Sequence, residues 1–151
     1  MKLITLNTAK KKVEALRKSG KKIVFTNGCF DIIHSGHIKV LRKCRELGDV
    51  VIVGLNSDSS IRQLKGEKRP VNSLRDRVEV LSAISYVDYI IVFNELTPYN
   101  VVKVIKPDFL VKGGDYKAAD VVGREFAKKV VIISLLKDRS TTNIIEKILN
   151  K

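Results

Sequence analysis

Residues 23–37 have the sequence Ile-Val-Phe-Thr-Asn-Gly-Cys-Phe-Asp-Ile-Ile-His-Ser-Gly-His, and this stretch decides the fold. Its first four residues are mostly β-branched or aromatic and predict a short buried strand over residues 23–26. Asn27 and Gly28 predict a turn, and a helical apolar pattern follows over residues 37–47. A buried strand, a loop and a helix in this order are typical of one βα unit of a parallel sheet.

The rest of the chain continues this alternation. Further apolar runs predict strands over residues 50–55, 89–93, 109–112 and 130–135. Helical patterns cover residues 8–19, 73–84, 97–106 and 141–149, with expected N-caps at Thr8, Ser73, Thr97 and either Ser140 or Thr141. Residues 62–69 are expected to form a basic loop. Apolar strands separated by helices predict an α/β fold: one Rossmann-like, doubly wound domain with a five-stranded parallel sheet.

Charge and composition favour a protein that binds anions and disfavour membrane-spanning, secreted and disulfide-rich proteins. Lys and Arg number 29 against 16 Asp and Glu, so the formal net charge is +13. Residues 1–22 carry +7 and residues 62–77 carry +4, and such clusters attract polyanions. The longest apolar runs are far shorter than the roughly 18 residues that cross a bilayer, and no signal peptide is expected at the N-terminus. Two cysteines, Cys29 and Cys44, are too few for a disulfide framework and favour reduced thiols in the cytoplasm.

The only two histidines of the chain, His34 and His37, lie three residues apart at a predicted helix start. That spacing places both rings on one face, where helix N–H groups already favour an anion, and Gly36 between them lets a ligand approach the backbone. Neither GxxxxGK[ST] nor GxGxxG is present. Two alternatives stay open: a zinc site shared with Cys29, and purely structural histidines. We expect a phosphate site.

Six stretches together resemble the cytidylyltransferase-like nucleotidyltransferase superfamily, and within it the heptose 1-phosphate adenylyltransferases of the ADP-heptose pathway. They are Thr-Asn-Gly-Cys-Phe-Asp (26–31), His-Ser-Gly-His (34–37), Val-Gly-Leu-Asn-Ser-Asp (53–58), Leu-Lys-Gly-Glu-Lys-Arg-Pro-Val-Asn (64–72), Val-Lys-Gly-Gly-Asp-Tyr (111–116) and Ser-Thr-Thr (140–142). The resemblance implies that residues 1–151 form a single nucleotidyltransferase domain, with a basic N-terminal helix in 1–22 and a catalytic core over 23–151.

The resemblance also implies a reaction in which AMP passes from ATP to a sugar 1-phosphate and pyrophosphate leaves. His34, His37 and Lys65 are then the expected catalytic residues, and Arg69, Arg77 and Arg139 the expected contacts to substrate phosphate. The expected nucleotide-binding residues are Thr26, Asn27, Gly28, Cys29, Phe30, Asp31, Gly36, Lys112, Gly113, Gly114, Asp115, Ser140, Thr141 and Thr142.

Several of these expectations carry alternatives. Asp31 is expected either to order its loop or to act directly, and Arg77 either to contact phosphate or to lock its helix. Mg²⁺ is expected to be held mainly by the nucleotide, with no metal site in the protein, and a homodimer is expected. A cytidylyltransferase that acts on glycerol 3-phosphate or another phospho-alcohol is the alternative within the class. A nucleic-acid binder is disfavoured because residues 62–77 contain no aromatic residue for base stacking, and no membrane partner is expected.

Overall fold

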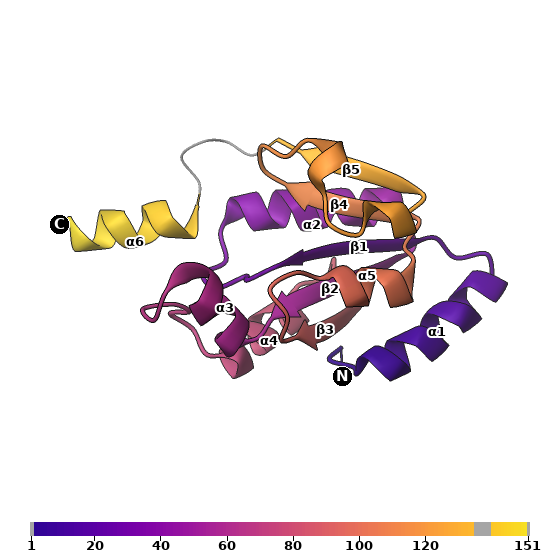
Figure 1. The fold of residues 1–151 in the computed structure, drawn as a ribbon, viewed down its shortest axis with the longest axis horizontal. Coiled ribbons are helices and arrows are strands. Elements are labelled where there is room, and N and C mark those ends of the chain that lie inside the picture. Colours follow the sequence, from indigo (N-terminus) through magenta and orange to yellow (C-terminus); the bar gives the residue numbers. More distant parts are fainter. Residues whose placement is uncertain (1, 135–139, 151) are drawn as a thin grey trace.

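The computed structural model describes residues 2–134 and 140–150, which form five strands and six α-helices with two short 3₁₀ turns (Figure 1). The elements in chain order are α1 (Leu6–Lys18), β1 (Ile23–Gly28), α2 (Ser35–Leu47), β2 (Val50–Asn56), α3 (Asp58–Lys65), α4 (Leu74–Ala83), β3 (Tyr89–Phe93), α5 (Tyr99–Ile105), β4 (Phe109–Gly113), η1 (Ala118–Asp120), η2 (Arg124–Phe126), β5 (Lys129–Ile133) and α6 (Thr141–Leu149).

The five strands form one parallel sheet in the order β3-β2-β1-β4-β5. The chain moves outward from β1 to β3, then returns and adds β4 on the other side of β1. The order therefore reverses between β1 and β4, and in open parallel sheets ligands bind at the carboxyl ends of the strands beside such a reversal. The predicted doubly wound α/β fold is confirmed.

Helices cover both faces of the sheet, as the figure shows. On one face, Ala9 and Val13 of α1 and Val102 of α5 pack with Phe25 of β1 in one apolar cluster. On the other face, α2 and α4 pack against Val24, Val51 and Val53 in two further clusters. Neighbouring strand residues thus face opposite layers, which is why the strands are apolar throughout.

Part of the N-terminal positive charge has structural partners. Arg17 donates to the carbonyls of Ile105 and Lys106 at the end of α5, where a cation also meets the negative end of the helix dipole. The ammonium of Lys12 lies 5.3 Å from the centre of the Tyr89 ring. The basic helix α1 is therefore fixed to the sheet through both apolar and cationic contacts.

The structure corrects several predicted boundaries. α1 begins at Leu6 with Thr5 as its N-cap, not at Thr8, and α5 begins after Pro98 with no side-chain cap from Thr97. Asn27 and Gly28 belong to β1 and do not form a turn. β5 begins one residue earlier than expected, and Leu135, its predicted end, lies outside the described residues.

The largest difference is α3, which occupies residues 58–65 where the sequence analysis expected the loop to begin. Its N-cap is Ser57, whose side chain accepts from the N–H of Ser60. The basic loop therefore starts only after Lys65, so that Lys65 lies at a defined helix end.

Candidate active site

The loop between β1 and α2 is shaped by a left-handed residue. Phe30 has φ +44° and its side chain is buried, with its ring 5.0 Å from that of His37. Non-glycine residues adopt this conformation at a cost, and such strain gathers at binding sites. The bend turns the chain from the end of β1 into the start of α2 and places the His37 ring over a buried aromatic surface.

His34 and His37 form the N-terminal cap of α2 with their own side chains. Nδ1 of His34 accepts from the backbone N–H of Gly36 at 3.1 Å, and Nδ1 of His37 accepts from the backbone N–H of His34 at 3.3 Å. The two rings lie 3.9 Å apart. Because each Nδ1 is an acceptor, each neutral ring carries its hydrogen on Nε2. The pair therefore offers two N–H donors beside the positive end of α2.

Burial keeps both histidines neutral. It lowers the pKa of His34, and burial together with the neighbouring His34 and Lys65 lowers the pKa of His37 to about 4. At neutral pH the site thus donates hydrogen bonds through neutral imidazoles, and the full positive charge comes from lysines.

The lowered pKa of His37 predicts a pH-dependent stability. The unfolded chain takes up a proton near the ordinary value of 6.5, whereas the folded chain does so only near 4. The free energy of unfolding is therefore undiminished by His37 at a pH above its ordinary pKa of 6.5, and it falls as the pH decreases toward 4. From pH 7 to pH 5 this group costs about 2 kcal/mol of the free energy of unfolding. Urea denaturation of the protein and of His37→Asn at both pH values measures it, and an equal pH dependence in the two would contradict the assignment.

A cavity of about 510 Å³ opens at the carboxyl ends of the strands and contains this histidine pair. Lys65 reaches it from the end of α3 and Lys112 from β4, and Ser140, Thr141 and Thr142 line it from the start of α6. Thr141 fixes this wall by donating from its hydroxyl to the carbonyl of Ile32 at 3.2 Å. Burial lowers the pKa of Lys112. Donors from four separate elements thus converge on one space.

Asp31 holds residues 69–72 against the loop between β1 and α2. Its carboxylate accepts from the backbone N–H groups of Val71 and Asn72 and from Nε of Arg69 at 2.8 Å. Burial opposes ionisation of this carboxyl, but the N–H donors of Asn72 and Val71 and the Arg69 guanidinium outweigh it and lower its pKa. Of the two roles expected for Asp31, the structure shows loop ordering, because neither Asp31 nor Arg69 lines the cavity.

Arg77 is an internal clamp and not a ligand for phosphate, which corrects that expectation. Its side chain is 1% exposed. Nη1 donates to the carbonyls of Cys29 and Asn56, and Nη2 pairs with Asp58 at 2.7 Å. One guanidinium therefore joins the loop between β1 and α2 to the end of β2 and the start of α3, and Arg77 does not line the cavity.

The other expected site residues divide as follows. Thr26, Asn27, Gly28, Cys29, Phe30, Gly36 and Gly113 line the cavity, whereas Gly114 and Asp115 do not. Arg139 lies outside the described residues. Ten further residues line the cavity that the sequence analysis did not name as site residues: Val40, Asn56, Leu64, Leu96, Thr97, Pro98, Tyr116, Asp120, Val121 and Val122. Asn56, Leu64 and Tyr116 lie in stretches that carry the family resemblance, and most of the others follow a strand end, so both signals were available. Val40, which lies within α2, had neither signal.

Within residues 2–134 and 140–150, no three His, Cys, Asp or Glu side chains gather closely enough to hold a metal ion. In the same part of the chain, no helix has the length and apolar character needed to cross a bilayer.

Comparisons with known proteins identify the family to which the chain is related. A family model described as cytidylyltransferase-like matches residues 25–147. The chain is 55% identical over 132 residues to the bifunctional protein HldE of a Nitratiruptor species, covering 87% of this chain and 29% of that protein. It is 51% identical over 146 residues to the protein of the same name from Wolinella succinogenes, covering 97% of this chain and 31% of that protein. The chain thus spans less than a third of the length of these curated relatives.

Two solved structures are similar as well. The lipopolysaccharide core biosynthesis protein from Thermoplasma volcanium superposes with a TM-score of 0.66 at 30% identity, covering 78% of this chain and 100% of that one. A pantoate-beta-alanine ligase from Francisella tularensis superposes with a TM-score of 0.68 at 17% identity, covering 100% of this chain and 80% of that one. The second likeness shows the fold alone.

Proposed function

The chain belongs to the cytidylyltransferase-like family, and we propose that it is an adenylyltransferase that transfers AMP from ATP to heptose 1-phosphate and releases pyrophosphate. The observation that carries the proposal is the pair His34 and His37 at the start of α2, with both Nδ1 atoms engaged by backbone N–H groups. The free Nε2–H groups, Lys65 and Lys112 supply the donors and the charge that a triphosphate needs.

In the proposed reaction, an oxygen of the sugar phosphate attacks the α-phosphorus of ATP and forms the new P–O bond. The bond from the α-phosphorus to the bridging oxygen breaks on the opposite side, and its electron pair leaves with pyrophosphate. His34 and His37 stabilise the negative charge on the phosphoryl oxygens, and Lys65 neutralises the leaving group. No side chain forms a covalent bond, so the catalytic contribution is positioning and charge stabilisation.

The choice of substrates rests on similarity. The motifs at 64–72 and 111–116 resemble those of the heptose branch, and the similar protein from Thermoplasma is described as acting in lipopolysaccharide core biosynthesis. The HldE relatives share more than half of the aligned residues. These findings favour heptose 1-phosphate and ATP over the alternative, a cytidylyltransferase for glycerol 3-phosphate or another phospho-alcohol.

The remaining parts of the proposal concern cofactor, compartment and assembly. We propose that Mg²⁺ enters with the nucleotide, whose phosphates hold it and whose charge it neutralises. The free thiols of Cys29 and Cys44 fit the reducing cytoplasm. By its resemblance, the chain is proposed to act as one catalytic unit over residues 1–151, as a homodimer, on small molecules and without a nucleic-acid partner.

A panel of substrates tests the proposal. Pyrophosphate release is measured with ATP and with CTP, each combined with heptose 1-phosphate and with glycerol 3-phosphate. We expect release with ATP and heptose 1-phosphate at a rate at least tenfold above the other three pairs, on the scale of discrimination that one well-matched hydrogen-bonded site gives. The fastest release from CTP with glycerol 3-phosphate would favour the alternative.

A further inference from the structure

The cavity takes its lining from elements on both faces of the sheet, and its residues are grouped here by the elements that carry them. The phosphate lobe, formed by His34, His37, Lys112 and residues 140–142, lies toward α2 and α6. The α5–η1 lobe lies on the side of α5 and is formed by Leu96, Pro98, Tyr116, Asp120 and Val122. α1 and α5 cover that face of the sheet and α2 covers the other (Figure 1). None of the residues of the α5–η1 lobe has a role in the transfer of AMP as described above.

Asp120 gives the α5–η1 lobe a charge that a phosphate site would not use. Among the described residues it is the one acidic side chain that lines the cavity, whereas Lys65 and Lys112 are cationic. A carboxylate repels the phosphates of both substrates, but it accepts hydrogen bonds strongly from hydroxyl groups. Its position therefore fits a neutral, hydroxyl-bearing part of a ligand.

The same lobe exposes apolar surface. Tyr116 is 50% exposed, Leu96 50% and Val122 38%, and Leu64, at 48%, lies at its border. Exposed large apolar side chains that gather in a concave site mark a surface that a ligand covers. A carboxylate beside an exposed aromatic ring combines an acceptor for hydroxyls with a flat face for the C–H groups of a sugar.

The segment that carries Asp120 is fixed to the core. The next residue, Val121, is 3% exposed and packs in the same cluster as Val102. Gly123 follows with φ +84°, and a Cβ atom there would lie 2.8 Å from Val102. On the other side, the ammonium of Lys112 lies 5.4 Å from the centre of the Tyr116 ring. The backbone at Asp120 is thus fixed before any ligand binds, which lowers the entropic cost of binding.

We infer that the α5–η1 lobe binds the hydroxylated ring of the acceptor sugar phosphate, with Asp120 accepting hydrogen bonds from its hydroxyls and Tyr116 packing on its C–H face. This inference rests on the proposed function. Asp120 and Tyr116 are then determinants of specificity that reject acceptors without a sugar ring. Lys112 of the phosphate lobe lies beside the Tyr116 ring, so we expect the phosphate of the acceptor to meet the α-phosphate of ATP at this lysine.

The test measures KM for heptose 1-phosphate and KM for ATP separately in Asp120→Ala, Asp120→Asn and Tyr116→Ala. Loss of hydrogen bonds to a charged acceptor is expected to raise KM for the sugar phosphate about tenfold or more in Asp120→Ala. The neutral Asp120→Asn, which still accepts through its amide oxygen, should lie between it and the wild type. KM for ATP should stay within twofold in all three.

Glu125→Gln is the matched control, because Glu125 is an exposed acidic residue of η2 outside the cavity. Its KM for heptose 1-phosphate and its KM for ATP should both equal those of the wild type. An unchanged KM for the sugar phosphate in Asp120→Ala overturns the inference, and a rise only in KM for ATP overturns it in favour of the adenosine moiety as the occupant. A wild-type protein that forms no nucleotide sugar overturns the proposed function itself, and that failure is visible without any variant.

Discussion

Replacing His37 by alanine is expected to lower kcat at least about a hundredfold, the usual cost of removing one preorganised donor from a developing negative charge. His34→Ala is expected to do the same. In the structure each ring presents Nε2–H to the cavity while its Nδ1 accepts a backbone N–H. Within the part of the chain that the structure describes, neither Nε2 has a hydrogen-bond partner. Loss of a ring should therefore lower kcat more than it lowers the affinity for the sugar phosphate.

The capping role of the histidines has to be separated from their role toward phosphate. Asparagine is a favourable N-cap whose side-chain oxygen can accept the same backbone N–H, but it has no donor at the position of Nε2. His34→Asn should therefore keep the free energy of unfolding near that of the wild type, whereas His34→Ala loses about 1 kcal/mol. Both should lose turnover equally. Turnover of His34→Asn and His37→Asn close to the wild-type value would refute the phosphate assignment.

Replacing Arg77 by methionine is expected to destabilise the fold by about 3–5 kcal/mol, the range for breaking a buried ion pair by removing one partner. Two carbonyls and Asp58 lose their donors at once. The Cys29 carbonyl belongs to the loop between β1 and α2, which leads into the histidine pair, so the variant should also lose activity. Urea denaturation followed by circular dichroism measures the change in the free energy of unfolding.

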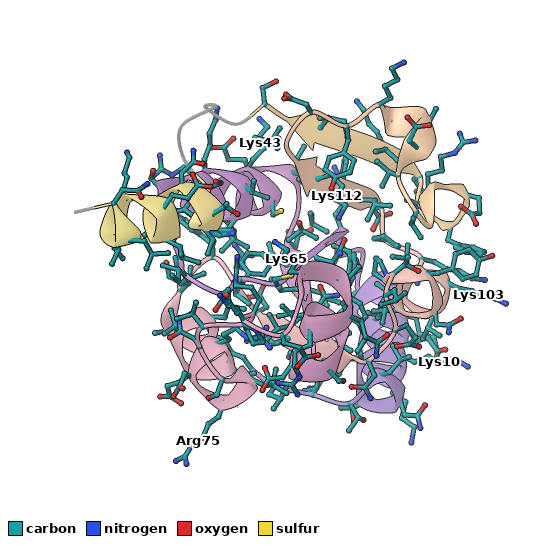
Figure 2. All side chains as sticks on the ribbon, turned by 60° about the vertical axis from the view of Figure 1, so that its left-hand side comes forward. Lys10, Lys43, Lys65, Arg75, Lys103 and Lys112 are labelled. Atoms are coloured by element: carbon teal, nitrogen blue, oxygen red, sulfur yellow. The ribbon has the colours of Figure 1, made fainter. Side chains whose placement is uncertain are left out.

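Arg75→Met is the matched control on the same helix, because Arg75 is exposed and extends away from the molecule (Figure 2). Its stability should change by less than about 0.5 kcal/mol. Arg77→Lys keeps the positive charge but loses the planar set of guanidinium donors. Its free energy of unfolding should therefore lie between those of Arg77→Met and Arg75→Met. Should Arg77→Met not fold, Arg77→Lys still decides: a stability equal to that of the wild type would contradict the clamp.

The architecture could be predicted because the strands are apolar on both faces. That pattern arises only where helices cover the sheet on both sides, and the chain alternates in the way that a parallel sheet requires. α3 escaped prediction because its sequence, Asp-Ser-Ser-Ile-Arg-Gln-Leu-Lys, is short and polar and carries its apolar face on little more than Ile61, which is fully buried. The helix depends on its Ser57 cap and on tertiary contacts of Asp58, Ser60 and Ile61, none of which a periodicity search weighs.

Some residues of the candidate site could also be predicted from the sequence, whereas others could not. The histidine pair was predictable because the chemistry and the helix start coincide in a few consecutive residues. Arg77 was ambiguous because an arginine in a helix has the same sequence pattern whether it faces solvent or the interior, and its partners at Cys29 and Asn56 lie far along the chain. Tyr116 ends one of the stretches that carry the family resemblance, but Asp120 has no local signature, and only the folding of the β4–β5 connection beside α5 brings it to the cavity.

The transfer of AMP itself is tested most directly by ³¹P nuclear magnetic resonance of the wild-type protein with ATP, Mg²⁺ and heptose 1-phosphate. We predict that the signals of ATP and of the sugar phosphate decline together, while a sugar-linked diphosphate and pyrophosphate appear in equal amounts. Pyrophosphate that forms equally without the sugar phosphate, or no new diphosphate signal with any sugar or alcohol phosphate, would contradict the account.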